Sequence, residues 1–191
     1  MSDGAPRLAR IRPEAMTPQQ KTVYDAVLNS PRASAARTGP GEPLPGPFNA
    51  MLLSPPVGLA LQNLGSALRY ESQLPDLIRE LIILLVAGRH DSAYEQYAHE
   101  PIAQRAGADD DTVDCLRAGE VPAGLGEPVE LALRVAETLL DRELADEEYA
   151  HAVAELGEAW LFEINAVIGY YQLLARQLAL FGVRPPQEMG R

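Results

Sequence analysis

The residues best equipped for chemistry are a glutamate and a histidine four positions apart, Glu95 and His99. Residues three or four apart on an α-helix lie on one face, so a helix here would place the carboxylate beside the imidazole. Such a pair is typical of general acid–base catalysis. The spacing therefore predicts His99 as the principal catalytic residue and Glu95 as its partner.

Glu95 also has a purely structural interpretation. It lies three residues after Ser92, and the sequence Ser-Ala-Tyr-Glu fits a capping box, in which the carboxylate accepts a hydrogen bond from the backbone N–H of the N-cap residue. A position in the first helical turn also favours the ionised carboxylate, because the helix dipole is positive there. Both interpretations of Glu95 remain open at this point.

A metal site is the next hypothesis, because His90, Glu95 and His99 supply two imidazoles and a carboxylate. His90, however, lies across a Gly/Asp/Ser-containing turn at no recognised ligand spacing, so we predict no metal site. Arg89 and His90 are instead candidates for binding a substrate carboxylate, although turns often contain such residues. Tyr94 and Tyr97 are candidates for pocket walls or for core packing.

Two helices must position these residues. The first is expected over residues 75–89, and its middle, residues 81–87, is apolar all the way round, which is typical of a central helix. The second is expected to begin at residue 91 or 92. It contains Pro101, which removes one backbone hydrogen bond close to His99.

The rest of the chain predicts an all-α fold without a convincing strand. Residues 31–47 contain five prolines and three glycines, so they predict a long loop, either a lid, an arm over a neighbour or a flexible insert. Residues 1–15 predict a mobile arm, residues 16–185 one domain and residues 186–191 a tail. Further helices are expected over residues 17–29, 56–70, 109–118, 128–142, 146–155 and 158–181.

Local patterns mark the start of two of these helices. Thr17 and Gln20 fit a capping box at the first helix, and Ser54 is a candidate cap for the helix over residues 56–70. In that second helix, Leu64 is among the leucines expected to point inward.

Composition narrows the class of protein. The chain of 191 residues carries 16 Lys and Arg against 27 Asp and Glu, a net charge of −11, and has no basic run, so nucleic acid and anionic membranes are poor partners. Its longest strongly apolar run, residues 81–88, is too short to span a bilayer. The N-terminus has no apolar signal core, and the only cysteine, Cys115, fits a reducing compartment. We therefore expect a soluble, cytoplasmic protein.

Several short motifs resemble a known family when they are taken together. They are Gly46-Pro47-Phe48, Leu68-Arg69-Tyr70-Glu71-Ser72, Arg79-Glu80-Leu81, Tyr94-Glu95-Gln96, Ala98-His99-Glu100-Pro101 and Val167-Ile168-Gly169-Tyr170-Tyr171. This combination resembles the single-domain branch of the carboxymuconolactone decarboxylase and alkylhydroperoxidase D-like superfamily. The resemblance implies a multi-helix bundle, a homo-oligomer (dimer, trimer or hexamer), no cofactor, and Glu80 as a third catalytic residue that relays protons.

The chain departs from the family pattern at two places. Redox-active members carry a Cys-x-x-Cys pair between the glutamate and the histidine, whereas this chain has Ser92 and Glu95 there. Without two thiols, disulfide-based peroxide reduction is lost, so a thiol peroxidase is the least favoured function. Gln96 replaces the usual tryptophan of the branch, which would remove a large ring from a pocket wall.

The resemblance implies a cofactor-independent lyase of the decarboxylase type, or an isomerase, in aromatic compound catabolism. Its substrate would be a small carboxylated molecule or lactone. Loss of CO2 leaves a carbanion, to which a protonated His99 could return a proton while Glu95 stabilises the imidazolium. The alternative is a non-redox relative that binds a ligand or serves in assembly. Glu95 and His99 facing an enclosed cavity would favour the enzyme, and open solvent around both would favour the alternative.

Overall fold

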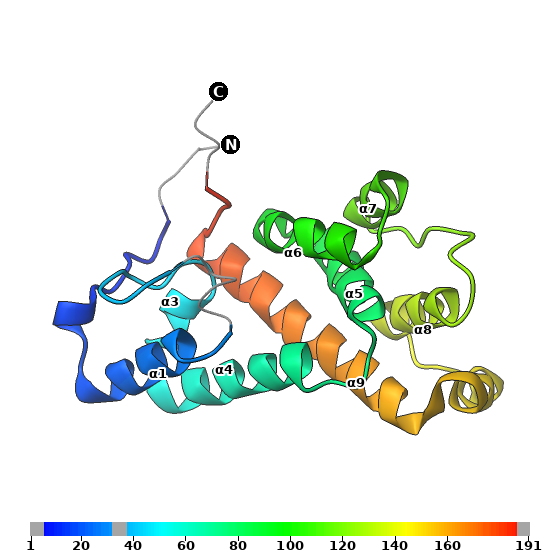
Figure 1. The fold of residues 1–191 in the computed structure, drawn as a ribbon, viewed down its shortest axis with the longest axis horizontal. Coiled ribbons are helices and arrows are strands. Elements are labelled where there is room, and N and C mark those ends of the chain that lie inside the picture. Colours follow the sequence, from blue (N-terminus) through cyan, green and yellow to red (C-terminus); the bar gives the residue numbers. More distant parts are fainter. Residues whose placement is uncertain (1–5, 32–37, 187–191) are drawn as a thin grey trace. The chain divides into compact units, whose positions relative to one another are not determined.

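The computed structural model describes residues 6–31 and 38–186, and all regular structure in these ranges is helical. The predicted all-α fold is thereby confirmed. Figure 1 shows the helices along the chain. They are η1 (Pro13–Ala15), α1 (Pro18–Leu28), α3 (Phe48–Met51), α4 (Pro55–Tyr70), α5 (Asp76–Arg89), α6 (Ala93–Ala106), α7 (Asp110–Arg117), α8 (Val129–Asp141) and α9 (Asp146–Phe181).

The chain forms two compact units. One comprises Met1–Glu71 and Arg176–Arg191, and the other comprises Ser72–Ala175. That residues 16–185 are a single domain stays a prediction. All three predicted catalytic residues lie in the second unit, which contains α5 to α8 and most of α9.

In the first unit, α1 packs against α4, and so does the short helix α3. The predicted capping box of α1 is present, because Thr17 Oγ1 accepts from Gln20 N and Gln20 Oε1 accepts from Thr17 N. The close approach of α3 to α4 requires glycine at position 58, where a Cβ atom would lie 2.0 Å from the carbonyl oxygen of Met51. The expected helix cap at Ser54 is wrong, since its side chain makes no cap hydrogen bond.

The N-terminal segment makes long-range hydrogen bonds within the first unit. The backbone N–H of Arg7 donates to Phe181 O at 2.9 Å, and Asn49 bonds the backbone of Ala9 and Ile11. No sequence pattern indicated these bonds, and the mobility of residues 1–15 stays a prediction. Residues 32–37 of the predicted loop and 187–191 of the predicted tail lie outside the described residues.

Helix α5 is the central helix of the second unit, as its composition predicted. Every residue from Ile78 to Gly88 is buried, and α5 packs against α6, α7 and α8. Gly88 allows α7 to lie very close, because a Cβ atom there would come within 2.2 Å of Leu116 O. A helix that is apolar all the way round is buried by its neighbours, and these three helices pack against it.

The last two predicted helices form one long element with a break. Within α9, Gly157 has φ 80° and ψ 156°, a non-helical conformation that glycine adopts without a Cβ penalty. This break falls between the two predicted segments. Within the described residues, no helix is both long and apolar enough to cross a membrane.

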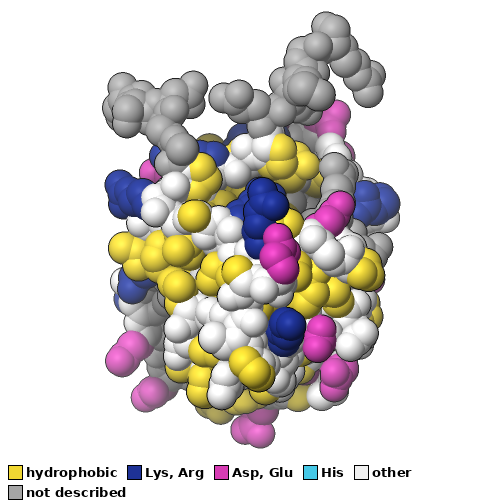
Figure 2. All heavy atoms as spheres, turned by 90° about the vertical axis from the view of Figure 1, so that its left-hand side faces the viewer, with side chains coloured by type: hydrophobic (Ala, Val, Ile, Leu, Met, Phe, Trp, Pro, Cys, Tyr) yellow, Lys and Arg dark blue, Asp and Glu magenta, His cyan; other side chains and the backbone are white. Residues whose placement is uncertain are grey.

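Charged side chains are distributed without a basic patch on the face shown in Figure 2. Lys and Arg side chains lie singly among Asp and Glu side chains, with hydrophobic groups between them. The described side chains of this face therefore form no continuous positive surface of the kind that nucleic-acid binding uses.

Candidate active site

The second unit brings together the three residues predicted to be catalytic. His99 Nδ1 lies 2.7 Å from Glu80 Oε2, a hydrogen-bond distance, and His99 Nε2 lies 3.3 Å from Glu95 Oε2. The exposed fractions are 0% for Glu80, 3% for Glu95 and 4% for His99. One imidazole therefore joins two buried carboxylates, one at each ring nitrogen.

A tight turn between α5 and α6 creates this arrangement. Asp91 has a left-handed φ of 49°, and Ser92 N donates to Ala87 O at 2.9 Å, so the chain reverses and α6 lies along α5. The side of α6 turned inward then carries Ser92, Glu95, His99 and Ala103. Three of these four are polar, and they face a protein interior that α5 makes apolar.

The capping-box interpretation of Glu95 is wrong. Ser92 occupies the N-cap position of α6, yet its side chain makes no cap hydrogen bond. The Glu95 carboxylate points to His99 instead. The carboxylate is thus part of a buried cluster and does not serve to start the helix.

Arg79 extends the cluster on the side of Glu80. Its guanidinium Nε lies 3.7 Å from Glu80 Oε1, and its Nη2 donates to Asp76 at 2.6 Å. The arginine is itself buried, with 5% exposed. With His99 protonated, the two cations Arg79 and His99 balance the two carboxylates, which is the condition for holding charge in a protein interior.

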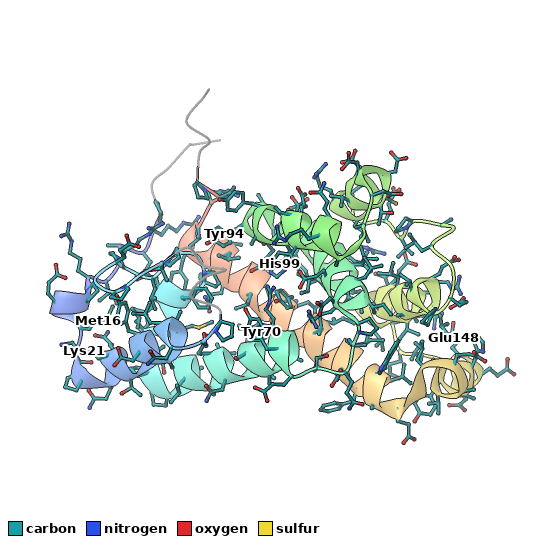
Figure 3. The ribbon with its side chains drawn as sticks, in the orientation of Figure 1. Met16, Lys21, Tyr70, Tyr94, His99 and Glu148 are labelled. Carbon is teal, nitrogen blue, oxygen red and sulfur yellow. The ribbon has the colours of Figure 1, made fainter. Side chains whose placement is uncertain are left out.

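A tyrosine of α9 contacts the imidazole from another direction. The ring of Tyr171 lies edge-on to that of His99, with centroids 5.2 Å apart and an interplanar angle of 90°. Figure 3 shows His99 on the side of α6 that is turned towards α9. Tyr170 packs edge-on against Tyr171 in turn, which fixes this aromatic wall.

Two buried polar atoms at the start of α6 have no hydrogen-bond partner among the described residues. They are Glu95 Oε1 and Ser92 Oγ. A buried polar atom without a partner costs about 1–3 kcal/mol, so each such atom calls for an explanation. Glu95 therefore uses one oxygen on His99 and keeps the other available.

The four predicted substrate-binding residues lie at the ends of helices or towards the surface. Arg89 is exposed and bonds Gly119 O, Glu137 and Asp141, so its guanidinium links α5 to α8. His90 is the C-cap of α5. Tyr94 and Tyr97 contact each other edge-on at 6.3 Å, and Tyr97 is 36% exposed. None of these contacts joins them to His99, and their role in binding substrate stays a prediction.

The cysteine lies on a different helix from the cluster. Cys115 is on α7, and burial together with the charge of Glu120 raises the pKa of its thiol. A raised pKa leaves little thiolate, the reactive form of cysteine. Among the described residues, no group of three or more His, Cys, Asp and Glu side chains is arranged to hold a metal ion.

Sequence reasoning missed three residues of the site. In the sequence, Ser92 was interpreted as a helix cap and as the residue at a cysteine position of the family. Arg79 and Tyr171 entered through the family motifs, without a role in the site. The tyrosine had a usable signal, because it lies in one of the motifs that carry the family resemblance. The unpartnered state of Ser92 had none, since it depends on which atoms surround the hydroxyl.

The comparisons with known proteins agree with the family resemblance. Residues 55–138 match the carboxymuconolactone decarboxylase family, a range that includes Glu80, Glu95 and His99. The apo crystal structure of the debrominase Bmp8 is similar, with a TM-score of 0.69, 18% identity and coverage of 97% of this chain and 94% of that chain.

A second similar structure is a variant of that debrominase in complex with 2,3,4-tribromopyrrole. Its TM-score is 0.70 at 17% identity, and the alignment covers 96% of this chain and 93% of that chain. At this level of identity the likeness shows a shared helical fold. The comparison with curated proteins found no match.

Proposed function

We propose that this chain, whose residues 55–138 match the carboxymuconolactone decarboxylase family, is a cofactor-independent lyase or isomerase that uses Glu80, His99 and Glu95 as a proton relay. Its substrate is a small carboxylated molecule or a lactone. The observation that carries the proposal is the buried imidazole held between two carboxylates, with Nδ1 at 2.7 Å from one and Nε2 at 3.3 Å from the other.

Each residue of the relay has a distinct role. Glu80 accepts a hydrogen bond from Nδ1–H and so orients the ring with Nε2 towards Glu95. His99 exchanges a proton with Glu95 Oε2. The other oxygen, Glu95 Oε1, has no described partner and forms the end of the relay that meets the substrate.

Decarboxylation on this relay is a balanced proton transfer. The bond between carbon and the carboxylate breaks, CO2 leaves, and the electron pair moves into the adjacent carbonyl as an enolate. Glu95 in its acid form then gives a proton to carbon, His99 restores that proton from Nε2, and solvent water returns one proton to His99 before the next turnover. Isomerisation uses the same atoms, because the Glu95 carboxylate removes a proton from one carbon and returns it to another.

The low exposure of the cluster favours an enzyme over a scaffold. A carboxylate and an imidazole on open solvent would be free to serve as surface charges, whereas here both are at least 96% buried. Buried titratable groups in contact with one another are typical of functional sites. The aromatic wall of Tyr171 limits access of water to the ring.

The test is a mass-spectrometric screen of carboxylated lactones and related acids, carried out in D2O. We expect one of them to lose CO2, or to isomerise, with one deuterium at the carbon that was protonated. Glu95→Gln should abolish both the conversion and the deuterium incorporation. If none of these acids is converted by the wild type, the proposal is wrong.

Self-association is a second proposal, supported by an apolar groove on the second unit. The groove has a volume of about 320 Å³ and is lined mainly by Leu139, Leu144, Tyr149, Leu161 and Phe162. Phe162 is 73% exposed, and large exposed apolar groups mark interaction sites. Light scattering should show a dimer or larger assembly, and Phe162→Ser should reduce its size.

A further inference from the structure

The start of α6 contains two buried oxygen atoms without described partners, and the proton relay gives a role to only one of them. Ser92 Oγ and Glu95 Oε1 both lack a hydrogen-bond partner among the described residues, and their residues are 7% and 3% exposed. Ser92 is the N-cap residue of α6 and Glu95 is the third residue of this helix. The two orphan atoms therefore belong to side chains at the same end of α6, both of them buried.

Their chemistry is complementary. A serine hydroxyl donates one hydrogen bond, whereas an ionised glutamate only accepts. If the two groups existed to satisfy each other, they would form a hydrogen bond, and they do not. A buried donor and a buried acceptor that do not bond each other match a molecule that offers an oxygen to one and a proton to the other.

We infer that Ser92 Oγ donates a hydrogen bond to a carbonyl oxygen of the substrate while Glu95 Oε1 faces the carbon beside that carbonyl. This inference takes its substrate class, a carbonyl compound such as a lactone, from the proposed function. When the C–H bond breaks, the proton goes to Glu95 Oε1 and the electron pair moves to the carbonyl oxygen. Ser92 keeps its own proton and stabilises the developing negative charge, so it is a catalytic residue.

Ser72, in the same unit, is a serine whose hydroxyl has a structural role. Ser72 Oγ donates to Glu163 Oε2 at 2.6 Å and accepts from Leu74 N at 3.1 Å. Both hydrogen-bonding functions of that hydroxyl are used by the fold. Ser72 is therefore a matched control, a partly buried serine of the same unit whose hydroxyl is satisfied.

The first measurement is thermal unfolding of the wild type, Ser92→Ala and Ser72→Ala. Removing a buried hydroxyl that lacks a partner relieves a cost, so Ser92→Ala should unfold at the same temperature as the wild type or higher. Ser72→Ala should unfold several degrees lower. A comparable fall in Tm for Ser92→Ala would show that a structural water satisfies its hydroxyl, and the inference would be overturned.

The second measurement uses γ-butyrolactone, the simplest five-membered lactone, as a probe of the complete protein. Its binding is followed by NMR through the ring signals of His99. Loss of one hydrogen bond to the carbonyl should weaken binding about tenfold in Ser92→Ala and leave it unchanged in Ser72→Ala. Equal affinity of wild type and Ser92→Ala, or no binding to the wild type, would refute the inference.

Failure of this inference is distinguishable from failure of the proposed function. If the protein binds the lactone through Ser92 but converts no acid in the screen, the inferred binding site stands and the proposed reaction is wrong. If the wild type and Ser92→Ala convert a substrate equally well, the proposed reaction stands and the role of the hydroxyl is wrong. This second outcome is recognised by equal kcat values for the wild type and Ser92→Ala.

Discussion

Two carboxylates of the second unit, Glu95 and Glu148, differ in how the fold uses them. Glu148 is exposed and fully partnered, because both its oxygens lie 2.7 Å from the Arg142 guanidinium and one also accepts from Ala145 N at 2.8 Å. Glu95 is buried and has only His99, with one oxygen left without a described partner.

The difference shows which carboxylate serves the fold. Glu148 ties together the segment where α9 begins, and water would solvate its charge even without Arg142. Glu95 uses one oxygen on His99, and its other oxygen is a buried polar atom without a described partner, at a cost of about 1–3 kcal/mol. A group held at such a cost is more useful for chemistry than for stability.

The largest expected effect is a loss of activity when Glu95, but not Glu148, is replaced. Glu95→Gln and His99→Ala should each lower kcat/KM by roughly 10²–10⁴-fold, the range that general acid–base catalysis contributes. The helical circular dichroism should stay intact. Glu148→Gln is the control and should keep full activity; equal losses in all three variants would contradict the contrast.

The next effect concerns the apolar interior around the cluster. Leu84, in the middle of α5, is 1% exposed, and Leu84→Ala should lower the free energy of unfolding by about 2–5 kcal/mol because it leaves a cavity. Leu180 is 61% exposed, and its replacement by alanine should change this free energy by no more than about 0.5 kcal/mol. Denaturant unfolding of both variants provides the comparison.

The titration of His99 tests the two sides of the imidazole. A neighbouring carboxylate stabilises the imidazolium, and an amide does not, so Glu80→Gln and Glu95→Gln should both lower the pH at which His99 loses its proton. The shift should be larger for Glu80→Gln, since 2.7 Å is shorter than 3.3 Å. NMR gives both values, with the exposed His151 as an internal reference; an unmoved His99 in Glu95→Gln would remove Glu95 from the relay.

A smaller effect is the acid sensitivity of the exposed pair. Hydrogen bonds from Arg142 and from the Ala145 N–H lower the pKa of Glu148 from its ordinary 4.5 to about 2. Between these values the unfolded chain binds more protons, so the contribution of the pair is present above about pH 4.5 and is lost as the pH falls towards 2. Glu148→Gln should therefore reduce the fall in Tm over this range, and an unchanged Tm profile would show that the pair contributes nothing.

The smallest effect is expected at the cysteine. Cys115→Ser should leave turnover unchanged, and the purified wild type should not consume hydroperoxide with a dithiol donor. The raised pKa of this thiol, caused by burial and then by Glu120, keeps it protonated and unreactive. Robust peroxide reduction would contradict the assignment of the site to acid–base chemistry.

Sequence periodicity determined most of the helices because it depends on local chemistry. The Thr17 and Gln20 capping box, the all-apolar α5 and the break before the last long helix were all predicted from short patterns. The spacing of Glu95 and His99 placed both on one face of a helix for the same reason. The expectation that Leu64 points inward was wrong, since it is 43% exposed, because periodicity alone does not say which side of α4 is covered.

The sequence by itself determined that a carboxylate and an imidazole lie side by side on α6, because four residues make about one helical turn. The tertiary structure decided what surrounds them. It brought Glu80 of α5 to Nδ1 and Tyr171 of α9 to the ring, left the Ser92 hydroxyl without a described partner, and turned Arg89 towards Glu137 and Asp141. These contacts join residues far apart in the chain, and the state of the Ser92 hydroxyl depends on which groups the fold places around it. No local sequence pattern specifies either.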